Sequence, residues 1–256
     1  MKNIFEVITE EFVDDMEVIR SLVETFDDSK AAKARVAAAN SATLLVAATF
    51  EEFVREIARE FARAVVNNAR SFDKLPPKLA STAWKRTMED LSRLRLHGNR
   101  LDGGTEHGFG SAKTKFTVVH EFCMGDLTQD IYRDLIHNEN NMRPSELNSL
   151  FKVSGLTDIC LQLSGKQPIL EAFGELEPGK AHGKLLSALE DFFEHRNAIA
   201  HALKPGQSSG ASQIVSDINL LESFGKALLE TIDAHVKTLV RPMQDAVTAA
   251  GQPVGT

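Results

Sequence analysis

Residues 30 to 72 contain neither proline nor glycine, and this long uninterrupted stretch constrains the fold more than any other feature of the sequence. Its hydrophobic residues recur at steps of three and four: Val46, Phe50, Phe53, Ile57, Phe61 and Val65. That spacing puts them on one face of an α-helix, and no helix-breaking residue interrupts it. The stretch therefore predicts one long helix whose apolar face must pack against other elements.

Two further long helices are predicted, one near each end of the chain. Residues 4 to 26 repeat apolar side chains at helical spacing, and the polar residues 27 to 29 that follow are typical of a helix stop and a new N-cap. Residues from Ser212 onward show the same pattern as far as Ile232. Tyr and Trp, which favour strands, occur once each. We therefore expect an all-α, up-down helical bundle made from both ends of the chain.

The middle of the chain is less regular. Pro76 and Pro77 suit the first turn of a third helix ending near Leu96. Residues 97 to 110 hold five glycines and predict a loop, while residues 113 to 126 are ambiguous and could include a short strand. Shorter helices are expected at 128–137, 144–153 and 168–173, followed by a break at 174–183. We expect a single domain at 1–245, with an insertion at about 97–180 and a flexible tail at 246–256.

The net charge of −7 argues against a protein that coats nucleic acid without specificity, because phosphate attraction needs local positive charge. It does not exclude a local basic groove. Residues 84 to 101 carry five cations: Lys85, Arg86, Arg93, Arg95 and Arg100. This basic cluster is either a weak RNA-binding patch or an ordinary solvated helix face.

The sequence also bears on the cellular compartment and on cofactors. The N-terminus lacks the pattern of a signal peptide, and the longest nearly apolar run, at 42–50, is too short to span a bilayer. Cys123 and Cys160 show no CxxC spacing, so a reducing cytoplasm is the expected compartment. The histidines near the glycine-rich stretch lack the close spacing of metal ligands. We expect neither a metal nor another cofactor.

The segment with the most chemical information is a predicted helix at 184–203, which a Lys-Pro-Gly turn ends. Its apolar stripe consists of Leu185, Leu189, Phe192, Ile199 and Leu203. Arg196 occupies a position within this stripe, four residues after Phe192 and three before Ile199. A buried guanidinium is unfavourable unless it is paired or has an anionic ligand, so Arg196 is a candidate site residue.

Asn197 and His201 add polar groups to the same helix. They lie four residues apart and share a face, whereas Arg196 and His201 diverge by about 140° around the helix axis. These side chains can converge from the edges of one cleft, particularly if a second copy of the helix packs alongside. Arg suits phosphate recognition, and His suits proton transfer near neutral pH. In the alternative, Arg196 pairs with Glu190 or Glu194 and His201 only caps the helix.

The stretch from Arg196 to His201 resembles the R-x4-6-H motif of the HEPN superfamily, including the polar residue favoured after the Arg. The Pro/Gly/Ser turn and the long helix that follow are also similar to that superfamily. Near the other end, residues 40 to 54 resemble the "apolar run, Glu, aromatic" helix of its RiboL-PSP-HEPN branch. The resemblance covers roughly residues 1–72 and 184–240, and the middle third only vaguely.

This resemblance implies a HEPN-like bundle that forms a homodimer with the motif helices apposed. It also implies a metal-independent endoribonuclease acting in a toxin–antitoxin or phage-defence system, with RNA as substrate and an antitoxin as a further partner. Arg196 would bind the scissile phosphate, His201 would act as general acid or base, and Asn197 would orient one of them. Glu51 would either position Arg196 or pair with Arg55. The alternative function is an inactive HEPN module that binds RNA or a protein.

Overall fold

A computed structural model of the chain describes residues 2–27, 31–94, 104–137, 141–201 and 209–250, and these residues form helices without any strand. The long helices are α1 (Ile4–Asp27), α2 (Ala32–Asn68), α9 (Pro178–His201) and α10 (Ala211–Ala250). The others are η1 (Phe72–Lys74), α3 (Leu79–Arg93), α4 (Gly104–Cys123), α5 (Tyr132–Leu135), α6 (Pro144–Lys152), α7 (Ile159–Ser164) and α8 (Gln167–Phe173). The expected all-α class is confirmed.

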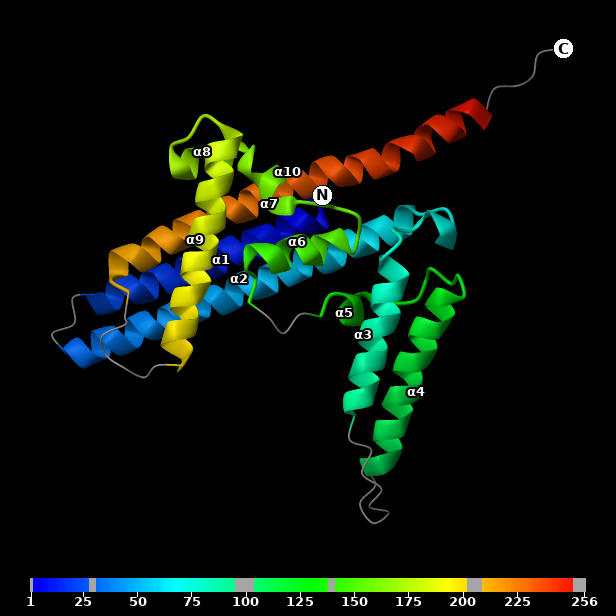
Figure 1. Cartoon of the computed structure of the whole chain (residues 1–256), viewed down its shortest axis with the longest axis horizontal. Helices are drawn as coiled ribbons and strands as arrows, with labels where there is room; N and C mark the ends of the chain where they lie inside the picture. Colours follow the sequence, from blue (N-terminus) through cyan, green and yellow to red (C-terminus); the bar gives the residue numbers. More distant parts are fainter. Residues whose placement is uncertain (1, 28–30, 95–103, 138–140, 202–208, 251–256) are drawn as a thin grey trace.

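Helices α1, α2 and α10 lie side by side and form the central bundle (Figure 1). Their apolar faces meet in a cluster of aromatic rings. Phe12 of α1 stacks on Phe53 of α2, with ring centroids 4.1 Å apart. Phe50 of α2 meets Phe224 of α10 edge-on at 5.1 Å. The apolar residues that recur at helical spacing therefore form the core, and this core joins helices from the two ends of the chain.

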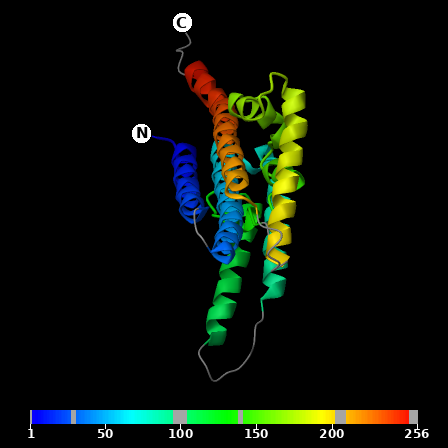
Figure 2. The same ribbon diagram turned by 90° about the vertical axis from the view of Figure 1, so that its left-hand side faces the viewer.

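Helix α9 crosses this bundle on the side opposite α1 (Figure 2). Phe193 anchors it, because this fully buried ring lies 6.2 Å from Phe50 of α2. Leu185 and Leu189 are also fully buried. The crossing brings the second half of α9 against α2, which is where the candidate site lies.

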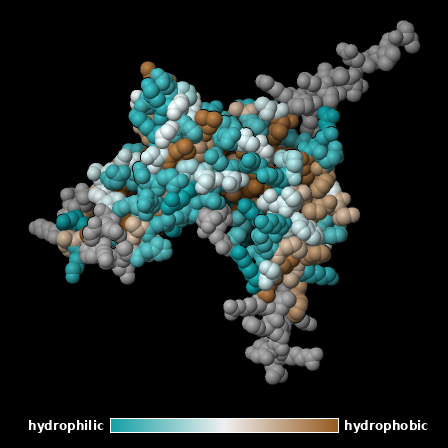
Figure 3. Space-filling model, in the orientation of Figure 1, coloured by the Kyte–Doolittle hydropathy of each residue, from teal (hydrophilic) through white to brown (hydrophobic). Residues whose placement is uncertain are grey.

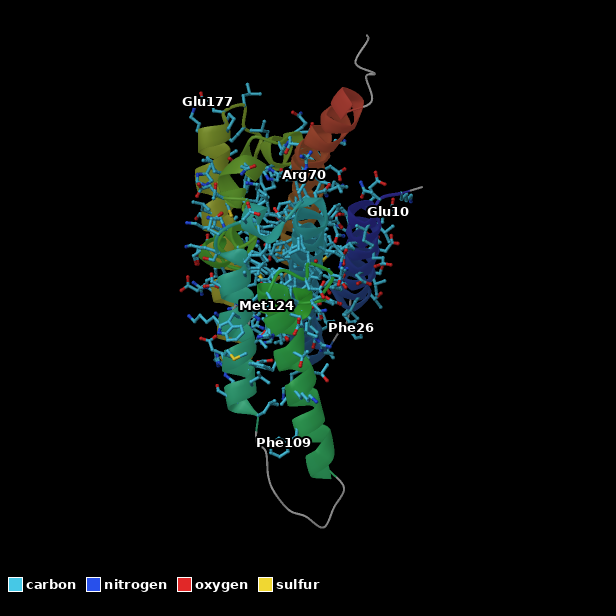
Figure 4. The ribbon with its side chains drawn as sticks, turned by 90° about the vertical axis from the view of Figure 1, so that its right-hand side faces the viewer. Glu10, Phe26, Arg70, Phe109, Met124 and Glu177 are labelled. Carbon is cyan, nitrogen blue, oxygen red and sulfur yellow. The ribbon has the colours of Figure 1, made fainter. Side chains whose placement is uncertain are left out.

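Helices α3 and α4 form a hairpin that projects away from the bundle (Figures 1 and 4). Trp84 and Phe116 pack edge-on across it at 6.1 Å, and Lys115 of α4 forms ion pairs with Asp90 at 2.7 Å and Asp134 at 3.1 Å. In Figure 4, Phe109 lies toward the far end of the hairpin and Met124 lies where α4 ends. Several apolar side chains of the hairpin, Trp84 and Phe116 among them, stay partly exposed.

Two expectations for the middle region were wrong. Residues 104–110 of the loop predicted at 97–110 belong to a helix that begins at Gly104, whereas residues 97–103 lie outside the described residues. The ambiguous segment 113–126 continues that helix to Cys123. Val119 and Phe122, three residues apart, are buried there. The helical spacing of such apolar residues and the packing of this segment against α3 therefore stabilise a helix despite the low helix propensity of its glycines. The break predicted at 174–183 ends at Pro178, because proline is well suited to the first turn of α9.

The remaining segments between α4 and α9 are short helices. Helices α6 and α8 agree closely with expectation, α5 is shorter than the predicted 128–137, and α7 was not predicted. Helices α7 and α8 pack against both α9 and α10, so part of the expected insertion contributes to the core. At the C-terminus α10 runs to Ala250, into the segment expected to be a tail.

The surface in the view of Figure 3 is mainly hydrophilic, with scattered hydrophobic groups that include parts of the hairpin. No helix in the described part of the chain is both long enough and apolar enough to cross a membrane.

Candidate functional site

Arg196 lies on α9, one turn after the buried Phe192 and Phe193. Its side chain is half-buried, and its Nε atom is buried without a hydrogen-bond partner among the described residues. Its Nη1 donates to Oδ1 of Asn197 at 3.2 Å. The Nε–H of this guanidinium is therefore a buried donor whose hydrogen-bonding capacity the described surroundings leave unused.

Glu51 of α2 faces the same region from across the α2–α9 contact. Only 8% of this residue is exposed. Its Oε2 accepts a bond from Nη2 of Arg55 at 3.2 Å, while Oε1 is buried and unpartnered among the described residues. Burial raises the pKa of the Glu51 carboxyl, although the positive charges of Arg196 and Arg55 act to lower it. Glu51 therefore makes the local pair with Arg55 and also interacts electrostatically with Arg196.

Asn197 connects the motif helix to the middle of the chain. Its Oδ1 accepts a hydrogen bond from Nδ2 of Asn141 at 2.8 Å, in addition to the one from Arg196. Asn141 lies just before α6. The half-buried amide of Asn197 is therefore held from two sides.

Neither carboxylate proposed as the local partner of Arg196 bonds to it in the described structure. Glu190 instead accepts a bond from Nη1 of Arg143 at 2.8 Å. Glu194 is exposed. The Arg196 side chain bonds to an amide and lies near a buried carboxylate of another helix.

His201 is the last residue of α9 that the structure describes, and it is exposed. It shares a helix face with Asn197, four residues earlier, but diverges from Arg196 by about 140°. The fold thus brings Arg196, Asn197 and Glu51 together and leaves His201 at an accessible helix end.

His195 faces a different partner from its neighbour Arg196. Its Nε2 lies 2.6 Å from Oγ of Ser209, in a pocket of about 410 Å³ between α9 and the start of α10. Asp217 also lines this pocket; burial raises its carboxyl pKa, and a bond from Gln213 and the charge of His195 act in the opposite direction. His195 therefore links α9 to the segment just before α10, and it takes no part in the hydrogen bond between Arg196 and Asn197.

Three of the five cations of the basic cluster, Lys85, Arg86 and Arg93, lie on α3 within the described residues. Arg86 is half-buried and donates to the backbone carbonyl of Leu135. Lys85 is exposed and lies 3.7 Å from Glu89. Arg93 is exposed and has other interactions. Arg95 and Arg100 lie outside the described residues.

Within the ranges that the structure describes, no group of three or more His, Cys, Asp or Glu side chains is placed to hold a metal ion. Cys160 is fully buried, and burial raises the pKa of its thiol to about 12. Cys123 is half-buried, and burial raises the pKa of its thiol as well. Because thiolates are the reactive form, neither cysteine is set up as a nucleophile.

Sequence reasoning missed Asn141 and Arg143. They lie 56 and 47 residues before their partners on α9. Nothing in the local sequence marks them, apart from Pro144, which predicts that a helix begins there. A contact over such a separation depends on how the helices pack, and the sequence alone does not give that packing.

The chain matches the RiboL-PSP-HEPN family model over residues 10–238, which runs from α1 into α10 and includes the whole middle region. No curated protein and no solved structure matches it. Because the match extends over most of the sequence and the fold is helical throughout its described part, the chain belongs to the RiboL-PSP-HEPN family.

Proposed function

We propose that this protein is a metal-independent endoribonuclease of the HEPN type. The observation that carries the proposal is the half-buried Arg196, whose Nε has no partner among the described residues, beside Asn197 and within a turn and a half of the exposed His201. Membership of the HEPN superfamily makes an RNA-related role the natural one for such a group.

In the proposed reaction the 2′-oxygen of the RNA attacks the neighbouring phosphorus, and the bond from phosphorus to the 5′-oxygen breaks. The products are a 2′,3′-cyclic phosphate and a free 5′-hydroxyl. Arg196 binds the phosphate oxygens and stabilises the charge that develops on them. His201 removes the 2′-proton or protonates the leaving 5′-oxygen. Asn197 orients the phosphate or the imidazole.

The divergence of Arg196 and His201 around α9 favours a site shared between two copies of the chain. In a homodimer with the α9 helices apposed, the Arg196 of one copy approaches the His201 of the other. A two-fold axis generates two equivalent sites in one cleft. The proposal therefore includes a homodimer as the active form.

A role as a toxin or phage-defence effector in the cytoplasm fits this activity, since uncontrolled RNA cleavage stops growth. Such an effector needs restraint, and an antitoxin protein that covers Arg196 and His201 would supply it. This part of the proposal rests on the family alone.

The test is cleavage of a mixed RNA substrate by purified protein in EDTA. We expect wild type to produce cyclic phosphate ends, while Arg196→Ala and His201→Ala lower the rate by about 100-fold or more, as is typical of acid–base and phosphate-binding groups. His182→Ala is the matched control, because His182 lies on the same helix, far from Arg196 in the sequence. We expect its rate to equal that of wild type.

Equal cleavage by wild type, Arg196→Ala and His201→Ala would mean that the RNase activity does not come from this site. Binding of RNA without cleavage by wild type would support the alternative, a catalytically inactive RNA-binding module.

A further inference from the structure

The start of α6 is held against the motif helix by two side-chain bonds of equal length. Asn141 donates to Asn197 at 2.8 Å, and Arg143 donates to Glu190 at 2.8 Å. The segment between them is also ordered internally, because the backbone N–H of Arg143 bonds to the carbonyl of Asn141 at 2.8 Å. Pro144 then begins the helix. Asn141 is therefore presented to α9 by a short, locally fixed segment.

The hydrogen bonds to Asn197 determine which end of its amide is left to bind a ligand. An amide oxygen has two lone pairs, and here Oδ1 accepts from Nδ2 of Asn141 and from Nη1 of Arg196. Turning the amide over would place its NH₂ group against two other donors. Nδ2 is thus the end of the Asn197 amide that remains to donate to a ligand.

We propose that Asn141 is a positioning residue of the proposed RNA site, one that fixes the amide of Asn197 so that its Nδ2, together with the Arg196 guanidinium, donates to the scissile phosphate. This inference rests on the proposed function. It gives a segment from the middle of the chain a direct role at the motif helix.

Arg143 provides a comparison, because it is attached to the same segment and also bonds to α9. Its ion pair with Glu190 is partly exposed, with side-chain exposures of 37% and 42%, and such pairs contribute little to stability. If the segment acts only as a structural anchor, loss of either bond should have a similar effect. If Asn141 positions Asn197, only its replacement should change RNA binding and cleavage.

The decisive variant is Asn141→Asp, which keeps the size of the side chain but replaces its NH₂ donor with an acceptor. The carboxylate would repel Oδ1 of Asn197, favour the turned-over amide and attract the Arg196 guanidinium. We expect kcat to fall by about tenfold or more, and Asn141→Ala to lose somewhat less, as expected for one hydrogen bond. Arg143→Gln should stay within about twofold of wild type.

A second measurement does not depend on cleavage. RNA with 2′-O-methyl groups lacks the attacking hydroxyl and reports binding alone. We expect Asn141→Asp to weaken this binding by about tenfold, and Arg143→Gln to leave it unchanged within about twofold. Asn197→Asp keeps the acceptor for both donors but removes Nδ2, so it should also weaken binding. Unchanged melting temperatures would show that the variants fold.

The outcomes separate the two proposals. If wild type cleaves RNA and Asn141→Asp cleaves and binds equally well, the positioning role is overturned and the nuclease stands. If Asn141→Asp and Arg143→Gln lose activity equally, the segment is only an anchor. If wild type does not cleave, the nuclease proposal fails, and the 2′-O-methyl RNA affinities alone decide whether Asn141 positions Asn197.

Discussion

Glu51 and Glu52 are consecutive residues of α2 whose pKa values shift in opposite directions. Burial raises the pKa of Glu51, and the attraction of Arg196 and Arg55 does not fully offset it. Burial also acts on Glu52, but hydrogen bonds from Arg55 and Arg59 outweigh it and lower that pKa. The difference follows from exposure, since Glu52 faces solvent and Glu51 faces the candidate site.

These shifts predict a pH dependence for Glu51→Gln. Because the pKa of Glu51 is higher in the folded protein, its contribution to stability is complete below the ordinary value of 4.5 and is lost as pH rises through the folded value. Gln cannot ionise and does not lose this contribution. The free energy of unfolding of Glu51→Gln, relative to that of wild type, should therefore increase as the pH rises through the folded pKa of Glu51. Urea unfolding at several pH values between 4 and 8 measures the difference.

Glu52→Gln is the matched control with the opposite sign. The lowered pKa of Glu52 contributes stability above its ordinary value, and this is lost as pH falls through the folded value. Glu52→Gln should therefore be less stable than wild type at pH 7, and the gap should narrow in acid. The same sign for both variants would contradict the assigned environments.

At the scale of single residues, a broken local pattern is what makes a site candidate visible in the sequence. Arg196 interrupts an apolar stripe and could be selected before the fold was known, whereas Glu51 was selected through the resemblance of its helix to that of the RiboL-PSP-HEPN branch. Asn141 could not be selected, because an asparagine before a helix is ordinary and its partner Asn197 lies 56 residues away. That its amide bonds to Asn197 depends on how α6 lies against α9.

The absence of a side chain at Gly225 of α10 allows α1 and α10 to pack closely. A Cβ atom added there would lie 3.0 Å from Cε1 of Phe12 and 3.4 Å from Cζ of Phe53. These two rings are the stacked pair at the centre of the bundle. The missing side chain of Gly225 therefore leaves room for the stack.

Gly225→Ala should destabilise the protein even though alanine favours helices. Overpacking a tight core costs about 1–3 kcal/mol, while replacing a helical glycine gains about 1 kcal/mol. We expect a net loss of up to about 2 kcal/mol in the free energy of unfolding, measured in urea. A gain in stability would mean that α1 can move away from α10 without loss.

Gly183→Ala tests the other half of this argument. Gly183 lies within α9, and an added Cβ would meet no atom within 4 Å. Only the helix preference then acts, so Gly183→Ala should stabilise the protein by up to about 1 kcal/mol. Destabilisation by this variant would show that glycine replacement alone, without crowding, lowers stability here.

Among the elements, those with long apolar stripes were predictable and those that depend on a neighbour were not. Helices α1, α2 and α10 begin close to where their sequence patterns do. Helix α4 starts among glycines and is stabilised by α3, through the Trp84–Phe116 contact and the ion pair of Lys115 with Asp90. Its local sequence therefore predicted a loop where packing produces a helix.

Across the whole molecule, the two ends of the chain are joined by specific bonds as well as by the core. Arg20 of α1 forms an ion pair with Glu222 of α10 at 2.9 Å and a hydrogen bond to Asn219 at 2.9 Å. Helices α1 and α10, from the two ends of the sequence, thus pack together. What the sequence did not reveal is that α7 and α8, inside the expected insertion, also pack on α9 and α10.

The proposed shared site makes a prediction that only the assembled molecule can test. If each site takes Arg196 from one copy and His201 from the other, a dimer of one Arg196→Ala chain and one His201→Ala chain has one intact site and one doubly altered site. Two inactive variants should then regain activity when co-expressed. A mixed dimer keeps one intact site of two, so purified mixed dimers should cleave RNA at about half of the wild-type rate.

The measurement is RNA cleavage by mixed dimers purified through two different affinity tags. The control pairs Arg196→Ala with a chain that carries both Arg196→Ala and His201→Ala, because no site in that dimer contains Arg196. This control should stay inactive. If mixed dimers of Arg196→Ala and His201→Ala form but stay inactive, each site takes Arg196 and His201 from the same chain. The RNA would then have to lie along the end of a single α9 helix.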